Sequence, residues 1–439
     1  YGGLQDNGSW GGPVATPFED GIAQSDWRRL LGADGFQSAV DPADPDTVYV
    51  ESQYGGLTRV SLRGGPKGPT TKAIRPPAPK GMPNRYNWNA PILLSPHDPK
   101  TLYYGAQHLY KSASRGDAWE KISPELTAPP KDAPAGSGYT ILALAESPVK
   151  AGVLWAGTDD GRLWVSKTDG KDWAEVSANL PGPKARAVAK VECSHADAGT
   201  AFVAVDRHRN DDFRPHLFAT TDYGETWKSI SGDLPAGAVV GVVRQSSKSK
   251  NLLFVGAETG LYVTFDGGAR WHHVAKSGLP AGVRVDDLVI HPRERELVVG
   301  THGRGVWVVD VSPLEQLTAE VLKSDAHLFD ITPVAALKPA KRDSDPPAGF
   351  KAANPSGRPV VSVYIGANGP DRVTLSYRAA GGDVRVDVAM LKPGLHALEL
   401  DQKLPVGEYA VTLKAGGVTQ TKKLVVRAAD EEPKRKIDE

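Results

Sequence analysis

The sequence predicts an all-β protein, a six- to seven-bladed β-propeller followed by a small immunoglobulin-like β-sandwich. The first supporting observation is an eight-residue turn, Ser/Thr-x-Asp-x-Gly-x-x-Trp, that recurs with small variations at 112–119, 166–173, 220–227 and 264–271. The tryptophans that end these copies are 54, 54 and 44 residues apart. Repeats at such spacing are typical of propellers and solenoids.

Each part of the turn has a mechanical role. A short Asp, Ser or Thr side chain accepts hydrogen bonds from backbone amides, and the glycine adopts a positive φ. The tryptophan returns a large apolar ring to the neighbouring sheet. We therefore interpret the four turns as structural hairpins rather than as catalytic motifs.

A second repeated pattern confirms the period. Six turns, most of them containing proline, each precede a short run rich in β-forming residues: Thr47–Val50, Thr101–Tyr104, Val153–Ala156, Ala201–Ala204, Leu252–Val255 and Leu297–Val299. Most of these runs lead through Gly and a small residue into a third strand, such as 161–165 or 260–263. With the strand after the tryptophan turn, each repeat has four antiparallel strands, which is one propeller blade.

Composition excludes several classes of function. The 439 residues include 52 basic and 52 acidic residues, so no charge excess points to nucleic acid or to an anionic membrane surface. No apolar run approaches the roughly 18 residues of a membrane span. The single cysteine, Cys193, permits no intrachain disulfide. Histidine spacing does not suggest zinc, and we expect neither a metal nor a cofactor.

We divide the chain into four parts. Residues 1–311 form the propeller, whose first blade is incomplete and lacks its inner strands. Residues 312–357 form a short helix, started by Ser312-Pro313, and a linker. Alternating apolar runs over 358–427 predict the sandwich, and 428–439 form a charged tail.

The start at Tyr1-Gly2-Gly3-Leu4 resembles the end of a second strand entering its hairpin. We therefore expect the chain to be the C-terminal part of a longer, exported and cleaved precursor. Its N-terminal part, or another propeller chain, is the expected protein partner.

These patterns carry a family resemblance that spans nearly the whole chain. The tryptophan turns resemble the Asp boxes of the bacterial neuraminidase repeat, and the chain resembles the C-terminal part of bacterial sortilin-like or glycosyl-hydrolase-like propellers within the xyloglucanase superfamily. The carrying residues are those at 1–10, 34–37, 51–56 and 86–91. The resemblance implies a secreted, periplasmic or cell-surface bacterial protein.

The residues of the xyloglucanase site match this sequence only in part. Asp6, in Gln5-Asp6-Asn7-Gly8, corresponds to one catalytic acid, and Gln53 stands where the second carboxylate is expected. If the chain is an enzyme, the resemblance implies a glycoside hydrolase, with Asp6 as its catalytic residue. Glycoside hydrolysis uses a pair of carboxylates, so the missing partner acid would come from the N-terminal propeller.

A site is expected where the hairpins between second and third strands converge with the long loop 75–89. Acids and amides bind sugar hydroxyls, and exposed rings stack on apolar sugar faces. The candidate ligand-binding residues are Gln53, Tyr54, Arg85, Trp88, His108, Asp159, Glu258, His302 and Arg304.

Two functions remain open at this point. The first is a glycan-directed protein that binds or hydrolyses polysaccharide at the axial cleft. The alternative is a non-catalytic, sortilin-like module that binds peptides or proteins or serves as a surface scaffold.

Overall fold

The computed structural model describes residues 1–63, 69–131, 138–184, 186–274, 278–336, 340–342, 346, 349–379, 385–400 and 403–428. The predicted charged tail, apart from Ala428, and part of the predicted linker lie outside these residues. The described residues form two compact units, one comprising Tyr1–Gly11 with Arg28–Val309 and the other comprising Gly12–Trp27 with the chain from Asp310 onward.

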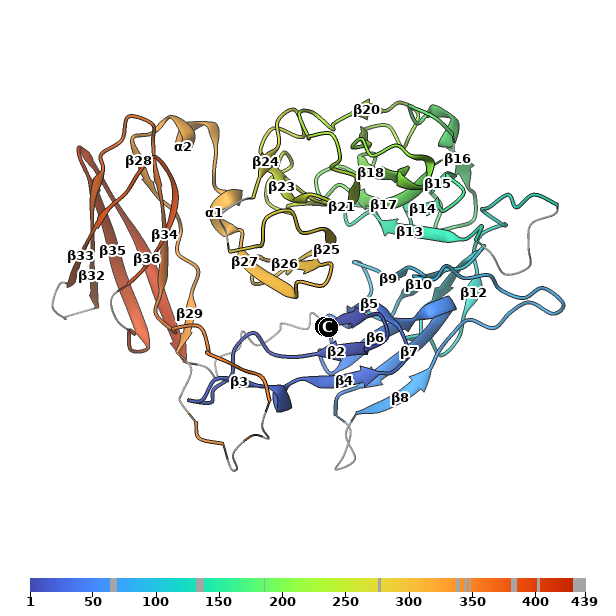
Figure 1. Ribbon diagram of the computed structural model, residues 1–439, viewed down its shortest axis with the longest axis horizontal. Helices are drawn as coiled ribbons and strands as arrows, with labels where there is room; N and C mark the ends of the chain where they lie inside the picture. The colour runs from blue at the N-terminus through green and yellow to red at the C-terminus, as the bar shows by residue number, and fades with distance from the viewer. Residues whose placement is uncertain are drawn as a thin grey trace. The chain divides into compact units, whose positions relative to one another are not determined.

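The first unit is the predicted all-β propeller. Its described residues contain seven antiparallel sheets, whose inner strands follow one another around a common centre (Figure 1). The first sheet has β1 (Gly2–Leu4), β2 (Gly8–Gly11) and β4 (Arg28–Leu31). The next two have β5 (Gly35–Val40), β6 (Thr47–Ser52), β7 (Gly56–Ser61) and β8 (Thr70–Ala73), then β9 (Ile92–Leu94), β10 (Leu102–Gly105), β11 (Leu109–Ser112) and β12 (Glu120–Lys121).

The remaining four sheets continue the same order. The fourth and fifth have β13 (Ile141–Glu146), β14 (Leu154–Thr158), β15 (Leu163–Ser166) and β16 (Ala174–Glu175), then β17 (Ala187–Cys193), β18 (Ala201–Asp206), β19 (Leu217–Thr220) and β20 (Lys228–Ser229). The sixth has β21 (Val240–Gln245), β22 (Leu253–Ala257), β23 (Gly260–Thr264) and β24 (His272–His273). The last has β25 (Val285–Ile290), β26 (Glu296–Thr301) and β27 (Val306–Asp310). Single 3₁₀ turns occur at Gln24–Asp26, Gln53–Gly55, Ser177–Asn179 and His208–Asn210.

The second strand of each complete sheet is buried on both faces. All residues of β10, β14 and β22 are buried, and the Trp155 side chain is fully enclosed. A sheet packed between two neighbouring sheets needs apolar side chains on both sides, so these strands appear as continuous apolar runs rather than as alternating patterns. This burial confirms the predicted second strands.

The tryptophan turns have the predicted internal geometry. In each copy the first Ser or Thr hydroxyl accepts a hydrogen bond from the glycine amide, over 2.9 Å in three copies and 3.1 Å in the fourth. Each glycine has a φ between +84° and +97°. Three of the indoles then reach the preceding sheet, where Trp119, Trp173 and Trp271 donate to the carbonyls of Ile74, Ile122 and Ile230 over 2.7, 3.0 and 3.0 Å. The turns therefore link consecutive sheets.

Inner strands carry a recurrent irregularity. The register between first and second strand shifts in β5, β13, β17, β21 and β25. A bulge of this kind redirects a side chain. In β5 the shift spans Phe36, and in β25 it spans Asp286, so both residues leave the regular alternation near the hairpins that join second and third strands.

The second unit has a two-sheet core. One sheet contains β28 (Ala326–Leu328), β31 (Val360–Ile365) and β34 (Gly394–Glu399). The other contains β29 (Val334–Ala336), β36 (Val418–Ala428), β35 (Gly407–Ala415), β32 (Arg372–Ala379) and β33 (Arg385–Met390). Both sheets contribute to one hydrophobic core that includes Leu328, Val363, Tyr377 and Leu413. The sandwich thus begins before residue 358, because β28 and β29 belong to it.

The segment expected to be one helix after Ser312 is divided. Helix α1 covers Ser312–Glu315 and α2 covers Ala319–Lys323. Thr318 separates them because its extended backbone stops the first turn while its hydroxyl accepts a hydrogen bond from the Val321 amide. The predicted start is one residue late, since Val311 is the N-cap and Ser312 is already helical.

Residues 12–27, included in the propeller by the sequence analysis, cluster instead with the second unit. There β3 (Ile22–Ala23) pairs with β30 (Lys351–Ala352). Arg342 forms ion pairs with Asp20 and Asp26 over 2.9 and 2.6 Å, and its guanidinium lies 4.0 Å from the centre of the Phe18 ring. The hydrogen bond to Asp26 raises the pKa of Arg342. These contacts join residues more than 300 positions apart, which local sequence patterns do not reveal.

The indole bridges give a testable stability difference. Trp271→Phe removes the donor to the Ile230 carbonyl in the preceding sheet, whereas the Trp227 indole donates only to Gly224 in its own turn. Because a buried hydrogen bond contributes about 1 kcal/mol, we expect Trp271→Phe to lower the urea midpoint more than Trp227→Phe does. Equal losses for the two variants would contradict a stabilising role for the bridge between sheets.

Candidate functional site

The candidate site lies at the hairpins joining second to third strands, as the sequence predicts for a propeller. Three residues other than glycine in these hairpins have left-handed backbones: Asp6 at φ +63°, Tyr54 at φ +58° and Asp211 at φ +56°. Such conformations cost about 1–3 kcal/mol and persist where the surroundings enforce them. At the second hairpin the packing beside Tyr54 is close, because a Cβ on Gly55 would lie 2.3 Å from the ring of Tyr86.

Three aromatic rings gather beside this hairpin. The rings of Tyr54 and Trp88 are 4.7 Å apart and nearly perpendicular, and Phe36 lies 5.9 Å from Trp88 in a similar edge-to-face contact. Tyr54 is 56% exposed and Trp88 is 38% exposed. We call Phe36, Tyr54 and Trp88 the aromatic platform. Tyr54 and Trp88 were predicted site residues, and the redirected Phe36 was not.

Two hydrogen bonds from backbone amides to side chains connect Asp6 to Gln53 through Asp34. The amide oxygen of Gln53 accepts a hydrogen bond from the Asp34 backbone over 2.8 Å, and an Asp34 carboxylate oxygen accepts one from the Asp6 backbone over 2.8 Å. Asp34 is buried, whereas Asp6 is exposed and its carboxylate has no hydrogen bond or ion pair within the described residues. The side-chain oxygen of Gln53 therefore connects its own hairpin, through Asp34, to the hairpin of Asp6.

Glu51 is a buried acid that the sequence analysis does not count as a site residue. It is fully enclosed, and one of its oxygens accepts a hydrogen bond from the Ala90 amide at the end of the long loop over 3.2 Å. Burial raises its pKa to about 9, so the side chain is neutral at pH 7. A neutral acid here anchors the loop that carries Trp88.

Arg85 and His108 have different surroundings. Arg85 forms an ion pair with Glu125, and its backbone amide donates to the Gln107 side chain over 2.8 Å. His108 is 4% exposed, and burial lowers its pKa. In this conformation His108 is enclosed and does not offer its ring to a ligand. Its neighbour Gln107, which is fully buried, fixes the loop instead.

Asp159 extends the polar surface toward the fourth sheet. Its carboxylate accepts hydrogen bonds from the Thr140 amide over 2.9 Å and from the Asn87 side chain over 3.3 Å. Burial is the largest influence on Asp159 and raises the pKa of its carboxyl. Because Asn87 precedes Trp88, a continuous series of contacts and chain neighbours links Asp6, Asp34, Gln53, Tyr54, Trp88, Asn87 and Asp159.

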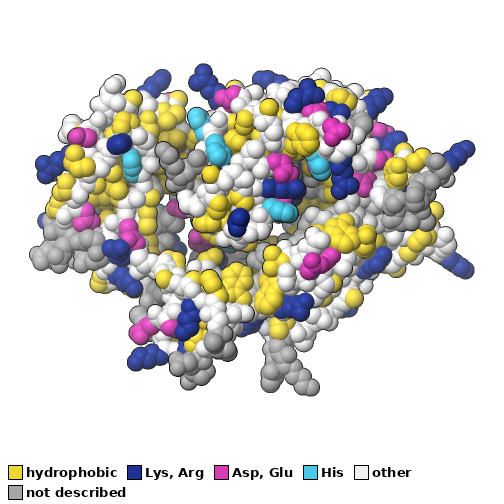
Figure 2. Space-filling view, viewed as in Figure 1, with side chains coloured by type: hydrophobic (Ala, Val, Ile, Leu, Met, Phe, Trp, Pro, Cys, Tyr) yellow, Lys and Arg dark blue, Asp and Glu magenta, His cyan; other side chains and the backbone are white. Residues whose placement is uncertain are grey.

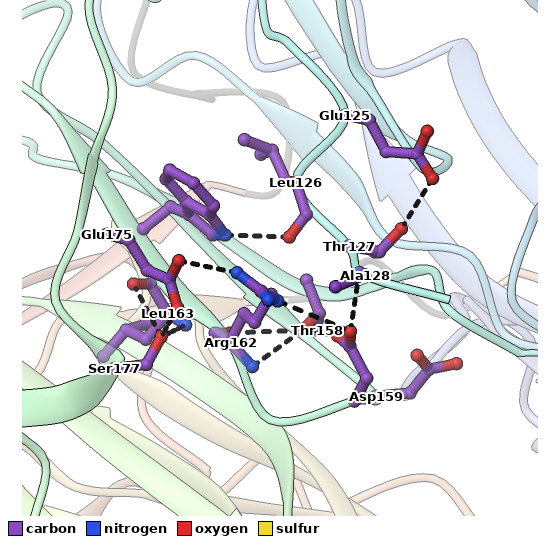
Figure 3. A network of polar contacts seen from close by, with 12 residues as sticks. Glu125, Leu126, Thr127, Ala128, Thr158, Asp159, Arg162, Leu163, Glu175 and Ser177 are labelled. Carbon is purple, nitrogen blue, oxygen red and sulfur yellow. Dashed lines mark hydrogen bonds and ion pairs between the residues drawn. The ribbon is translucent and has the colours of Figure 1, made fainter. Parts of the chain in front are cut away.

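The neighbouring network stiffens this side of the site (Figure 3). Asp160 accepts a hydrogen bond from the Ala128 amide over 2.9 Å, and Arg162 forms an ion pair with Glu175 over 2.6 Å. The Trp164 indole donates to the Leu126 carbonyl over 2.8 Å. The segment 125–128 is thus tied to the hairpin that presents Asp159.

A second polar group forms around the last sheet. Arg284 pairs with Glu258 over 2.9 Å and with Asp286 over 2.6 Å, and the His302 ring lies 3.1 Å from Asp286. Arg284 and Asp286 thereby bring the predicted residues Glu258 and His302 together. Arg304 is exposed and contributes its carbonyl to the Trp307 indole. Among the described contacts, none joins this group to the aromatic platform.

The surface also has a groove away from these residues. A groove of about 760 Å³ lies along the outer strands of the third and fourth sheets and is lined by Lys111, Trp119, Glu120, Asp169 and Lys171. None of the predicted site residues lines it. Figure 2 shows that Lys, Arg, Asp and Glu side chains are interspersed over the visible face rather than separated by sign. Within the described ranges, His, Cys, Asp and Glu side chains form no group of three suited to a metal ion.

Comparison with known proteins gives structural similarity only. No family model and no curated protein sequence matches the chain. The GH74 xyloglucanase from Xanthomonas campestris is similar over 95% of this chain and 71% of its own, with 15% identity and a TM-score of 0.49. The extracellular domain of a hybrid two-component system from B. thetaiotaomicron is similar over 97% of this chain and 55% of its own, with 10% identity and a TM-score of 0.47. YCF48 from Cyanidioschyzon merolae is similar over 68% of this chain and 89% of its own, with 13% identity and a TM-score of 0.41.

The chain therefore spans about seven-tenths of the first of these structures and about half of the second. The described residues include no helix with the length and apolar character needed to cross a bilayer.

Glu51 gives a pH-dependent prediction. Its pKa rises from 4.5 to about 9 on folding, so the folded state binds the proton more tightly and stability falls as pH rises through that interval. Glu51→Gln escapes this loss, and we expect it to exceed the wild type in unfolding free energy by up to about 3 kcal/mol at pH 7. The gain should vanish near pH 4. Chemical denaturation at pH 4, 7 and 9 measures it, with the exposed Glu120→Gln as the control. A gain that does not depend on pH would contradict a buried neutral acid.

Proposed function

We propose that the protein is an exported, glycan-directed propeller that binds polysaccharide across the hairpins that join its second and third strands. The observation that carries this proposal is the exposed, nearly perpendicular pair of Tyr54 and Trp88. The loop of Trp88 is anchored on the buried Glu51, and acids and amides belong to the same series of contacts. Aromatic rings supply a large apolar surface at low entropic cost when they are held rigidly. The apolar C–H face of a sugar ring fits such a surface, while its hydroxyls need polar partners around the rim.

Rigidity supports this reading of the platform. The Trp88 loop is anchored at its end by the Ala90 amide on Glu51, and its Arg85 amide is anchored on Gln107. Gly55, the residue after Tyr54, packs so closely against the Tyr86 ring that no side chain fits at that position. Because the rings are already ordered, a ligand need not pay to immobilise them.

The expected ligand is a neutral polysaccharide outside the cell, which is why export forms part of the proposal. Asp6, linked through Asp34 to Gln53, and Asn87 with Asp159 belong to the series of contacts that includes the platform, and these groups can bind hydroxyls. A peptide ligand, as in a sortilin-like module, is the competing function.

Binding of soluble polysaccharides tests the proposal. We expect Trp88→Ala to weaken the affinity for the best-bound β-glucan at least tenfold, which is about 1.4 kcal/mol, and Tyr54→Ala to have an effect in the same direction. Phe350→Ala, which removes a ring that is 62% exposed elsewhere, is the matched control and should leave binding unchanged. Calorimetry against a panel of glycans and a panel of extended peptides measures both classes. Binding of peptides but not glycans, or glycan binding that is indifferent to Trp88, would overturn the proposal.

Hydrolysis is a second candidate function because of Asp159. Glycosidases combine a protonated acid with a second carboxylate, and the raised pKa of Asp159 suits a proton donor. Asp6 supplies an exposed carboxylate at the other end of the same series of contacts. If the protein hydrolyses a glycan, we expect Asp6→Asn and Asp159→Asn each to reduce kcat at least 100-fold with little change in KM. Unchanged turnover in both variants would leave glycan binding without hydrolysis by these acids.

A further inference from the structure

Within the described residues, the last sheet of the propeller has three strands where five of its sister sheets have four (Figure 1). Strand β27 forms its outer edge, and all of its residues are exposed. The exposed fractions of Val306, Trp307, Val308 and Val309 are 58, 36, 38 and 42%. The corresponding strand β23 of the sixth sheet is buried along its whole length. Four consecutive exposed apolar residues on an open strand edge are a strong signal for an added strand.

The sister sheets show what covers this edge. In each of the five four-stranded sheets, the residue after the fourth strand is aliphatic and donates its amide to a leucine carbonyl near the start of the third strand. The bonds join Ile74 to Leu57, Ile122 to Leu109, Val176 to Leu163, Ile230 to Leu217 and Val274 to Leu261, over 2.8 to 3.0 Å. Val306 has the same place in β27 as Leu261 has in β23, one residue after the hairpin glycine.

The tryptophan of the same segment supplies a second contact. In four sheets the fourth strand belongs to a Trp-x-x-Ile/Val sequence, and three of those indoles donate to the aliphatic residue's carbonyl in the sheet before. By the same spacing, a strand added to β27 would direct its indole to the carbonyl of Val274. The edge therefore has two defined acceptors, the carbonyls of Val306 and Val274.

This chain has no spare segment of that type. Trp-x-x followed by Ile, Val or Leu occurs five times, beginning at Trp27, Trp119, Trp173, Trp227 and Trp271, and each copy contributes strand residues to a described sheet. A second copy of the chain would have to lose one of its own strands in order to donate it. The donor is therefore a different polypeptide segment.

We propose that β27 is a docking edge completed by an extended Trp-x-x-aliphatic segment from a polypeptide outside these 439 residues. The segment adds antiparallel to β27, with its aliphatic amide on the Val306 carbonyl and its indole on the Val274 carbonyl. This mode is β-strand addition, in which main-chain hydrogen bonds provide affinity and side-chain pockets provide specificity. The proposal is independent of any glycan site.

A peptide with the sequence of residues 264–274, labelled with a fluorophore, tests it. We expect saturable binding to the full chain with Kd below about 1 mM, and new hydrogen-exchange protection confined to 306–310. The matched control peptide carries an N-methyl group on the amide of its final valine, which removes the donor to Val306 and should weaken binding at least tenfold. Replacing the peptide tryptophan by phenylalanine should weaken it less, because only the bond to Val274 is lost.

Variants of the protein test the same edge from the other side. Val308→Pro removes an edge amide that should pair with the incoming strand, and proline is tolerated on edge strands, so this variant should fold and fail to bind. Val386→Pro in β33, the edge strand of the other unit, should bind as the wild type does. Absence of binding at 1 mM peptide, protection elsewhere than β27, or equal affinity of the N-methylated peptide would overturn the proposal. Circular dichroism confirms that each variant is folded.

Discussion

The propeller depends on a link that is made at the outer rim of its sheets. In the five four-stranded sheets, the fourth strand is followed by an aliphatic residue whose amide bonds to the third strand of its own sheet. The carbonyls of Ile74, Ile122 and Ile230 accept a hydrogen bond from an indole of the following sheet. One residue thus closes its own sheet and connects it to the next. Since each contact is between nearest neighbours, stability along the series is expected to accumulate sheet by sheet, as in other repeat architectures.

This arrangement explains how the opposite set of hairpins can sustain strain. The second strands are enclosed by neighbouring sheets, so the hairpins leaving them start from fixed positions. Strand β6, which leads to the Tyr54 hairpin, is buried in the same way, so Tyr54 can have a left-handed backbone because the surrounding contacts supply the missing stability. The register shifts in the first strands β5 and β25 also direct Phe36 toward Trp88 and Asp286 toward His302. A rigid scaffold with strained, exposed hairpins is a common way to present a recognition surface.

The sequence predicts candidate site residues from their position in the hairpins. Tyr54, Trp88 and Asp159 are site predictions because they occupy hairpins between second and third strands or the longest loop. Glu51 was not found, because a glutamate within a strand gives no sign of whether its carboxyl will be enclosed and neutral. His108 shows the opposite case, because the sequence does not tell whether a histidine in a hairpin is exposed or enclosed, and here it is enclosed. Asp34 acts through its position beside two hairpins, which no spacing in the sequence encodes.

The sequence by itself determined the all-β class, the repeated sheets and the turn geometry, because these depend on interactions within about fifty residues: alternation, glycine conformations and tryptophan spacing. Only the tertiary structure decided that residues 12–27 belong with the chain from Asp310 onward, that β28 and β29 enter the second core, and that the aromatic platform forms. Those outcomes depend on contacts between distant segments, such as Arg342 with Asp26. These contacts stabilise the fold through burial and pairing that exist only when both segments have come together.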